Sequence, residues 1–244
     1  MNIHNFRYHL IQKVAKKHPW KFFYTGLIPQ SIRWRLWRQW VDLYEQSLVA
    51  EKWKVYLDAS AGMADELVAK KKLELQGKNI IWQYWAQGLE NAPPVAQLSY
   101  ASVDCYAEGY QIIRLSDETV ADYIVLPNFI NLKRQIGDFK LAHYSDLLRV
   151  ALLYAYGGVW LDSTIVLTAP LPLRYLNEEI FMFSRDTASL NKELWGSNHT
   201  YFDWSTQSQV RHLNSLMIGQ RGSAQLKLLQ DLLLAYWQGE NSAG

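Results

Sequence analysis

One segment constrains the fold of this chain more than any other: residues 143–164, which read HYSDLLRVALLYAYGGVWLDST. Its leucines and alanines recur at intervals of three and four, which predicts a helix over Leu141–Tyr156. Gly157 and Gly158 stop that helix, and the apolar residues after them predict a strand over Val159–Asp162. A helix that turns at once into a buried strand is a building unit of an α/β fold.

The rest of the chain continues this alternation of strands and helices. Further strands are predicted at Asn79–Trp85, Tyr110–Leu115, Ile165–Leu167, Ile180–Ser184 and Ser215–Ile218. Further helices are predicted at Val95–Glu108 and Ala224–Trp237. This order predicts an α/β fold with a mixed, largely parallel sheet flanked by helices.

The same segment carries candidate chemistry. Asp146 and Arg149 lie three apart on one helix and therefore share a face. In the strand, Trp160 and Asp162 point to the same side. Asp162 ends the strand, which is where ligands bind in open α/β sheets. A carboxylate there could hold a divalent cation that bridges the phosphates of a nucleotide, and Thr164 shares its side if the extended path continues.

Each of these features also has a plain structural explanation. An Asp-x-x-Arg pair on a helix is usually a surface ion pair that contributes little. An Asp after an apolar strand is often a turn or cap residue. The diglycine permits a tight turn, which can also bring the backbone close to a ligand. Joined in one helix, turn and strand, the features are much more specific than any of them alone.

Residues 1–75 read as a separate helical region that is basic and rich in tryptophan. Residues 1–54 hold ten Lys and Arg against three Asp and Glu, which gives +7, and five of the eleven tryptophans. A helix with cations and interfacial aromatics can lie on an anionic membrane surface. The alternative is a helical cap on a catalytic domain, with its cations in solvent. Residues 76–244 would form that catalytic domain.

Composition narrows the classes of protein. Hydrophobic residues make up 49% and charged residues 20% of the chain, which excludes intrinsic disorder. The net charge of +2 is too small to indicate nucleic-acid binding, so no nucleic-acid partner is expected. The single cysteine, Cys105, excludes an intramolecular disulfide and is expected to be a buried apolar residue. No spanning helix and no secretion signal are expected, which favours a cytoplasmic protein.

The segment S-D-L-L-R-x-A-L-L-Y-x-Y-G-G-V-W-L-D-S-T resembles the sugar-transferase segment of the capsular polysaccharide synthesis protein family. That family is akin to glycosyltransferase family 32 and, more distantly, to clostridial glucosylating toxins. Three other stretches resemble the same family: residues 79–94 (NIIWQYWAQGLENAPP), 110–130 (YQIIRLSDETVADYIVLPNFI) and 168–172 (TAPLP).

This resemblance implies a GT-A-like, Rossmann-like fold and transfer of a sugar from a nucleotide-sugar donor, expected to be a UDP-sugar. It implies retention of the anomeric configuration and a Mn²⁺ or Mg²⁺ cofactor. The expected acceptor is a saccharide or a lipid-linked saccharide of a growing capsular or other surface polysaccharide. Attachment to the inner face of the plasma membrane would bring a lipid-linked acceptor within reach.

The resemblance also assigns roles to residues. Asp162 matches the first Asp of the Asp-x-Asp motif and would touch the metal or the ribose. Asp146 would hydrogen-bond donor-sugar hydroxyls, and Arg149 would lie beside the sugar and phosphates. Trp85 would stack on the base. Gly157 and Gly158 complete the predicted nucleotide- and sugar-binding set.

Thr164 departs from the wider pattern, which has a second Asp at this position. The substitution removes one anionic ligand from the predicted metal site, where Asp162 and Thr164 remain. A later residue could complete the ligand shell; the candidates are Asp203, His199, His212 and Asn214. The catalytic domain is also expected to be short at its C-terminus.

Two alternatives to an active transferase stay open. The first is a catalytically impaired, membrane-peripheral scaffold of a polysaccharide assembly complex, with a degraded metal motif. The second is a nucleic-acid binder that uses the basic N-terminal region, although no recognised binding module accompanies it.

Overall fold

The computed structural model describes residues 3–60, 67–186, 188–190 and 210–240. The chain divides into two compact units, one made of residues 1–55 and 184–212 and the other of residues 56–183 and 213–244. The chain passes between the units at three places: after residue 55, within helix α4 (Leu43–Ala59), and after residues 183 and 212. The predicted boundary at residues 75 and 76 therefore lies inside the second unit.

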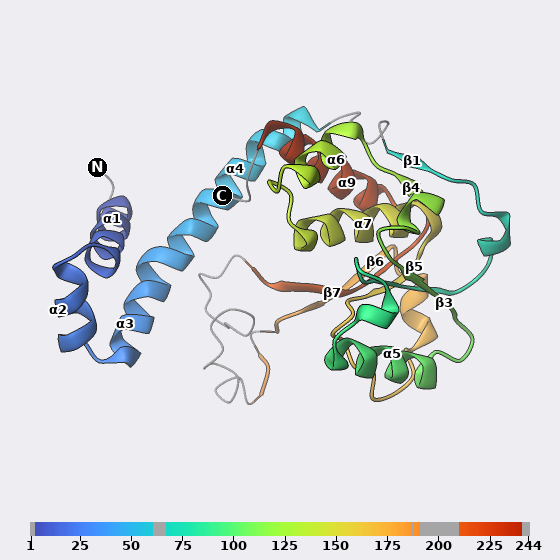
Figure 1. The fold of residues 1–244 in the computed structure, drawn as a ribbon, viewed down its shortest axis with the longest axis horizontal. Helices are drawn as coiled ribbons and strands as arrows, with labels where there is room; N and C mark the ends of the chain where they lie inside the picture. The colour runs from blue at the N-terminus through green and yellow to red at the C-terminus, as the bar shows by residue number, and fades with distance from the viewer. Residues whose placement is uncertain (1–2, 61–66, 187, 191–209, 241–244) are drawn as a thin grey trace. The chain divides into compact units, whose positions relative to one another are not determined.

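The first unit is helical where it is described before α4, as the sequence predicts (Figure 1). It contains α1 (Ile3–Lys16), α2 (Trp20–Leu27), α3 (Gln30–Trp37), the π-helical segment η1 (Arg38–Asp42) and most of α4. Its small core consists of Ile11, Tyr24 and Val41, each from a different helix. No helix in the described part of the chain is both long enough and apolar enough to cross a membrane.

The prediction that the helical region continues to residue 75 is wrong. After Ala59, the next described element is a short strand, β1 (Val68–Ala69), which pairs antiparallel with β4 (Ile124–Val125). A single 3-10 turn, η3 (Leu73–Leu75), follows. The hydrogen bonds of β1 to a distant strand override the local helical tendency of this stretch.

The second unit is built on a five-stranded mixed sheet in the order β3-β2-β5-β7-β6 (Figure 1). The bounds are β2 (Ile80–Tyr84), β3 (Gln111–Leu115), β5 (Gly158–Leu161), β6 (Ile180–Ser184) and β7 (His212–Gly219). Strands β3 and β5 both run parallel to β2, whereas β7 runs antiparallel to β5. The carboxyl ends of β2, β3 and β5 therefore meet at one edge of the sheet.

Helices cover both faces of this sheet (Figure 1). One face carries α5 (Pro94–Tyr106), and the other carries α6 (Asn128–Gln135), α7 (Leu141–Tyr156) and α9 (Ala224–Gly239). Three 3-10 turns lie in the connections: η4 (Leu89–Asn91), η5 (Val120–Asp122) and η6 (Leu173–Asn177). Side chains alternate between the faces, so Ile81 and Val159 pack with Val103 of α5. The predicted mixed α/β sheet flanked by helices is confirmed.

Two local predictions fail for identifiable reasons. Residues 165–167 do not form a strand, because side chains of α5 satisfy their backbone: the Ser99 hydroxyl donates to the Ile165 carbonyl at 2.5 Å, and the Leu167 N–H donates to Ser102 Oγ at 2.9 Å. Cys105, expected to be buried, lies exposed on α5. Its helix presents the opposite side, with Val103, to the core.

Candidate active site

Arg149 of α7 joins two carboxylates that are far apart in sequence. Its Nη1 donates to Asp146 Oδ1 at 2.7 Å, and its Nη2 donates to Asp162 Oδ1 at 2.7 Å. The Arg149 side chain is 4% exposed, whereas those of Asp146 and Asp162 are 38% and 31% exposed. A buried cation thus holds two carboxylates that both reach solvent.

Two more side chains orient this trio. The Trp160 indole N–H donates to Asp162 Oδ1 at 2.7 Å, and the Arg149 guanidinium lies 5.3 Å from the centre of the Trp160 ring. The Asn214 amide, at the start of β7, donates to Asp146 Oδ1 at 3.0 Å. Each carboxylate is therefore held by two donors, which limits its rotation.

The hydrogen bonds converge on one oxygen of each carboxylate. Asp146 Oδ1 accepts from Arg149 and Asn214, and Asp162 Oδ1 accepts from Arg149 and Trp160. No hydrogen bond within the described residues engages Oδ2 of either aspartate. Both Oδ2 atoms can accept hydrogen bonds from sugar hydroxyls or bind a cation.

The backbone around Asp162 is anchored on both sides. Its N–H donates to the Ser215 carbonyl at 2.8 Å, and its carbonyl accepts from the Ile165 N–H at 2.9 Å, which closes a turn. Ser163 within the turn is buried and donates to the Tyr84 carbonyl at 2.8 Å. The extended path needed to carry Thr164 to the side of Asp162 thus ends in a turn, and Thr164 is exposed there.

Gly157 and Gly158 lie at the start of β5, whereas Asp162 follows its end. Gly158 has φ +107°, and a Cβ on it would lie 2.5 Å from the Ile80 carbonyl oxygen. A Cβ on Gly157 would lie 3.0 Å from the Arg221 nitrogen. The close approach of β5 to β2 is by itself sufficient reason for a glycine at position 158, and no bound ligand is needed to explain it. The structure therefore does not bring the diglycine together with the three charged residues.

Trp85 follows β2 directly, at the sheet edge where Asp162 follows β5. Its N–H donates to the Leu115 carbonyl at 2.9 Å, and its ring packs on a cluster of Ala92, Ala96 and Tyr100. The indole Nε1 is buried and has no hydrogen-bond partner among the described residues. The side chain thus belongs in part to the core, and its stacking on a base stays a prediction.

The sequence model of the family described as "Capsular polysaccharide synthesis protein" matches residues 35–243. The match covers most of the chain and includes every residue of the site. The chain belongs to the capsular polysaccharide synthesis protein family.

Two curated relatives are glycosyltransferases by name. The O-glycosyltransferase PaGT of Phomopsis amygdali is 23% identical over 172 residues, which are 66% of this chain and 39% of that protein. Glycosyltransferase afumC of Aspergillus fumigatus is 24% identical over 172 residues, 66% of this chain and 41% of that protein. The chain therefore spans about two fifths of the length of these relatives. No solved structure matches it significantly.

In this member of the capsular polysaccharide synthesis family, a second polar network lies at the same sheet edge. The Tyr84 hydroxyl donates to Asp117 Oδ1 at 2.5 Å, and Arg134 forms an ion pair with the other oxygen of Asp117. The Arg134 guanidinium lies 4.1 Å from the centre of the Tyr144 ring. Burial, with a smaller contribution from Asp117, raises the pKa of Tyr84, so its hydroxyl stays protonated and donates at neutral pH.

Sequence reasoning missed this network because its members are dispersed over β2, α6, α7 and the loop after β3. It also gave Trp160 no role, although the alternation of the strand placed Trp160 on the side of Asp162. Among the four late candidates, Asn214 contacts Asp146, whereas His212 is exposed at the start of β7. Asp203 and His199 lie outside the described residues.

Proposed function

We propose that this protein transfers a sugar from a nucleotide-sugar donor, expected to be a UDP-sugar, to a saccharide acceptor of a surface polysaccharide. The observation that carries the proposal is the pair of partly exposed carboxylates that Arg149 joins at the carboxyl edge of the sheet. Each has one oxygen that no hydrogen bond among the described residues engages. The family and the names of the two relatives support the same chemistry.

In the proposed reaction, the bond between the anomeric carbon and the diphosphate oxygen breaks, and the diphosphate leaves with the bonding electrons. The acceptor hydroxyl forms the new bond to the anomeric carbon and passes its proton to the departing diphosphate. Asp146 Oδ2 binds donor-sugar hydroxyls, and the Arg149 guanidinium offsets negative charge that develops on the leaving group. Retention of the anomeric configuration is proposed from the sequence resemblance.

A Mn²⁺ or Mg²⁺ cofactor is part of the proposal, and the residues present fit one mode of binding. No group of three His, Cys, Asp or Glu side chains that could hold a metal ion occurs in the described parts of the chain. Mg²⁺ often binds through one carboxylate, with phosphates and waters as its other ligands. Asp162 Oδ2 would be the carboxylate ligand of such a cation. The cation would supply positive charge at the diphosphate.

We further propose that the acceptor is presented at an anionic membrane surface, on its cytoplasmic side, to which residues 1–54 attach. Their charge of +7 and the exposed aromatic residues of α2 and α3 support attachment. A lipid-linked saccharide would then be confined to the surface on which the enzyme works.

Calorimetry with a panel of nucleotide-sugars, with and without Mn²⁺, tests the proposal. At least one donor should bind with an affinity that Mn²⁺ increases. Asp162→Asn should abolish this increase, because the substitution removes the formal charge and keeps the side-chain volume. Asp122→Asn, at an exposed aspartate of η5, is the matched control and should behave like the wild type.

Equal Mn²⁺-dependent affinity in the wild type and Asp162→Asn would refute the assignment of Asp162. Absence of binding by every donor of the panel would favour the alternative of a catalytically impaired scaffold. Among the described residues, the turn at Thr164 leaves Asp162 without a second protein ligand beside it.

A further inference from the structure

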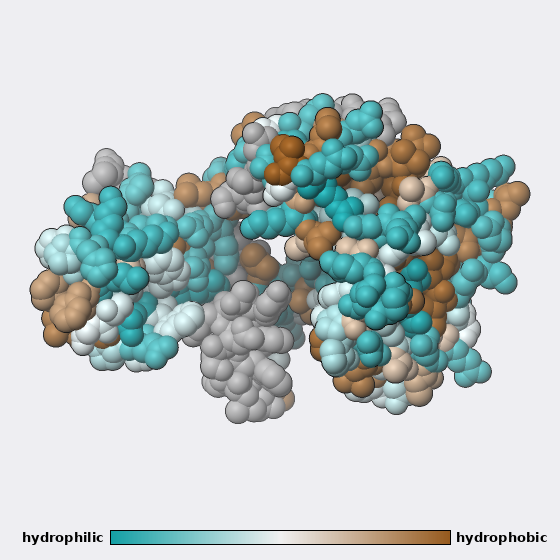
Figure 2. Space-filling view, viewed as in Figure 1, coloured by the Kyte–Doolittle hydropathy of each residue, from teal (hydrophilic) through white to brown (hydrophobic). Residues whose placement is uncertain are grey.

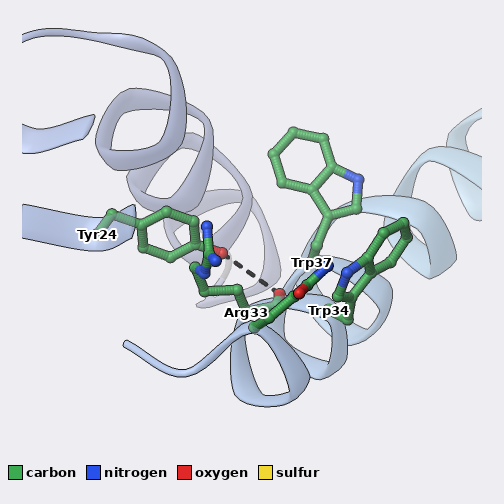
Figure 3. Close-up of a pocket in the computed structure, with 5 residues that line it drawn as sticks. Tyr24, Arg33, Trp34 and Trp37 are labelled. Carbon is green, nitrogen blue, oxygen red and sulfur yellow. Dashed lines mark hydrogen bonds between the residues drawn. The ribbon is translucent and has the colours of Figure 1, made fainter. Parts of the chain in front are cut away.

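The first unit, called the helical unit below, holds a pocket that the proposed sugar transfer does not use. Its volume is about 380 Å³, and its lining residues come from α2 and α3: Tyr24, Gln30, Arg33, Trp34 and Trp37 (Figure 3). All but Trp37 precede residue 35, where the match to the capsular polysaccharide synthesis family begins. Family membership therefore assigns no role to this pocket.

Arg33 gives the pocket a positive charge that no acidic side chain neutralises in the described part of the chain. None of the ion pairs among the described residues includes Arg33. Its Nε is buried and lacks a hydrogen-bond acceptor there. Leaving such a donor unsatisfied is costly, so an anionic oxygen that entered the pocket would stabilise it.

Contacts between α2 and α3 hold the walls of the pocket together. The Tyr24 hydroxyl donates to the Arg33 carbonyl at 3.3 Å, which ties α2 to α3 (Figure 3). Tyr24 is buried, and the Trp34 and Trp37 rings lie on the other side of Arg33 in the close-up. Trp34 is 56% exposed, so the pocket reaches solvent.

Helix α2 presents an apolar stripe next to the pocket. Trp20, Phe23 and Leu27 are exposed and follow one another at intervals of three and four, and Leu27 is 77% exposed. Tyr24 lies four positions after Trp20 and three before Leu27, so the stripe borders the pocket. Figure 2 shows apolar side chains gathered over the part of this unit that contains α2.

Helix α1 carries a second stripe of the same kind. Ile3, Phe6 and Leu10 are exposed at intervals of three and four, and the exposed Lys13 continues the spacing. Ile11, on another side of the helix, supplies the contact with the core. Two helices of one unit thus expose apolar side chains beside lysines, the pattern of helices that lie in a membrane interface.

We infer that the pocket between α2 and α3 binds the phosphate of an anionic lipid head group at Arg33, while the exposed apolar side chains of α2 enter the bilayer surface. The charge of +7 in residues 1–54 matches an anionic surface. Exposed Phe and Leu side chains favour a bilayer over a soluble saccharide, which would leave them in water. The inference rests on the proposed membrane attachment and is independent of sugar transfer.

Vesicle flotation of the full chain tests the inference. The probes are vesicles of phosphatidylcholine alone and vesicles that also contain phosphatidylglycerol. Arg33→Gln should weaken binding to the anionic vesicles more than about tenfold, the range of a hydrogen bond to a charged group. Arg35→Gln is the matched control: Arg35 is exposed on the same helix and outside the pocket, so its loss should cost about fivefold at most.

Arg33→Lys keeps the charge but loses the planar fork of donors, so its affinity should fall between those of the wild type and Arg33→Gln. All variants should keep the helical circular-dichroism signal and the thermal unfolding of the wild type, which shows that the helices around the pocket are folded. Equal losses in Arg33→Gln and Arg35→Gln would overturn the pocket while leaving membrane attachment intact.

Two further outcomes would also overturn the inference. Failure of the wild type to float with anionic vesicles would remove membrane attachment and the pocket together, without bearing on sugar transfer. Retention on immobilised dextran that Arg33→Gln abolishes would assign the pocket to a saccharide.

Discussion

At the scale of residues, Arg149 acts as an internal counter-ion for two carboxylates that both reach solvent. Both terminal nitrogens are committed, one to Asp146 and one to Asp162, and Trp160 lies against the guanidinium. The arrangement fixes the Oδ2 atoms of both aspartates, which have no hydrogen-bond partner in the part of the chain that the structure describes, before any ligand binds. Such pre-organisation spares the reaction the cost of reorienting these groups.

Asp146→Ala should lower turnover by about 10²–10³-fold, the range for removal of one well-placed polar contact in an active site. Binding of free nucleoside diphosphate should stay near the wild-type value, because that ligand lacks the sugar hydroxyls proposed to contact Asp146. Calorimetry and a donor-hydrolysis assay measure the two quantities. If the binding of nucleoside diphosphate and that of nucleotide-sugar weakened equally, Asp146 would instead be a structural partner of Arg149.

At the scale of elements, the site depends on how closely β5 packs beside β2. Gly158 permits this approach at the start of β5, and the Asp162 N–H bond to the Ser215 carbonyl continues the pairing with β7 past its end. Helix α7, which leads into β5, carries Asp146 and Arg149 over the same strand. The helix-turn-strand unit therefore aligns both halves of the site.

Gly158→Ala should lower the free energy of unfolding by roughly 2–5 kcal/mol, because a Cβ would both strain the backbone and overlap the Ile80 carbonyl. Gly109→Ala is the matched control: Gly109 has φ +82°, yet no atom lies within 4 Å of a Cβ placed there. It should cost only about 1–2 kcal/mol of strain. Urea denaturation measures both, and equal losses would contradict the packing role of Gly158.

The end of α7 is joined to the β1–β4 pair by Tyr156. Its hydroxyl has a single proton, which it shares between the Tyr123 carbonyl at 2.8 Å and the Lys70 carbonyl at 2.5 Å. Burial is the main cause that raises the pKa of Tyr156 to about 12. An unfolded tyrosine titrates near pH 10. The protonated hydroxyl therefore stabilises the folded state fully below about pH 10, and this contribution is lost as the pH rises toward 12.

Tyr156→Phe should cost about 1–2 kcal/mol at pH 8, since it leaves two carbonyls without this donor. The difference in unfolding free energy between wild type and variant should shrink as the pH rises from about 10 to 12. Urea denaturation at several pH values measures this difference. The titration of the other tyrosines affects wild type and variant alike, so it does not contribute to the difference. Two parallel pH curves would show that the Tyr156 hydroxyl does not stabilise the fold.

At the scale of the whole molecule, charge is distributed unevenly. The chain carries +2, and residues 1–54 alone carry +7, so the remaining residues carry −5. The second unit holds the candidate active site, and the helical unit holds the exposed apolar stripes and the Arg33 pocket. Catalysis and surface attachment are thus proposed for different units of one chain.

Binding to anionic vesicles should therefore weaken at least about tenfold when the salt concentration rises from about 0.1 M to 1 M, since the Debye length falls from about 10 to 3 Å. Binding to neutral vesicles should change little. Flotation at a series of salt concentrations measures both. An affinity for anionic vesicles that does not depend on salt would argue against electrostatic attachment.

The sequence by itself determined the elements whose signal is local. Helix α7, the glycine stop and β5 follow from apolar spacing and from the conformational freedom of glycine, and they form where predicted. Helical spacing also predicted that Asp146 and Arg149 share a face. Strand alternation predicted that Trp160 and Asp162 lie on the same side of β5. The family could be identified from motifs in these same segments.

Tertiary structure decided whatever depends on contacts between distant segments. The ion pair of Arg149 with Asp162, the contact of Asn214 with Asp146 and the Tyr84–Asp117 network each join separate elements. Partners remote in sequence also anchor the turn that diverts Thr164, through the bond from Ser163 to the Tyr84 carbonyl, and replace strand pairing at 165–167, through Ser99 and Ser102 of α5. Local patterns specify an element and its faces, whereas the partner of each face is selected only when the elements pack.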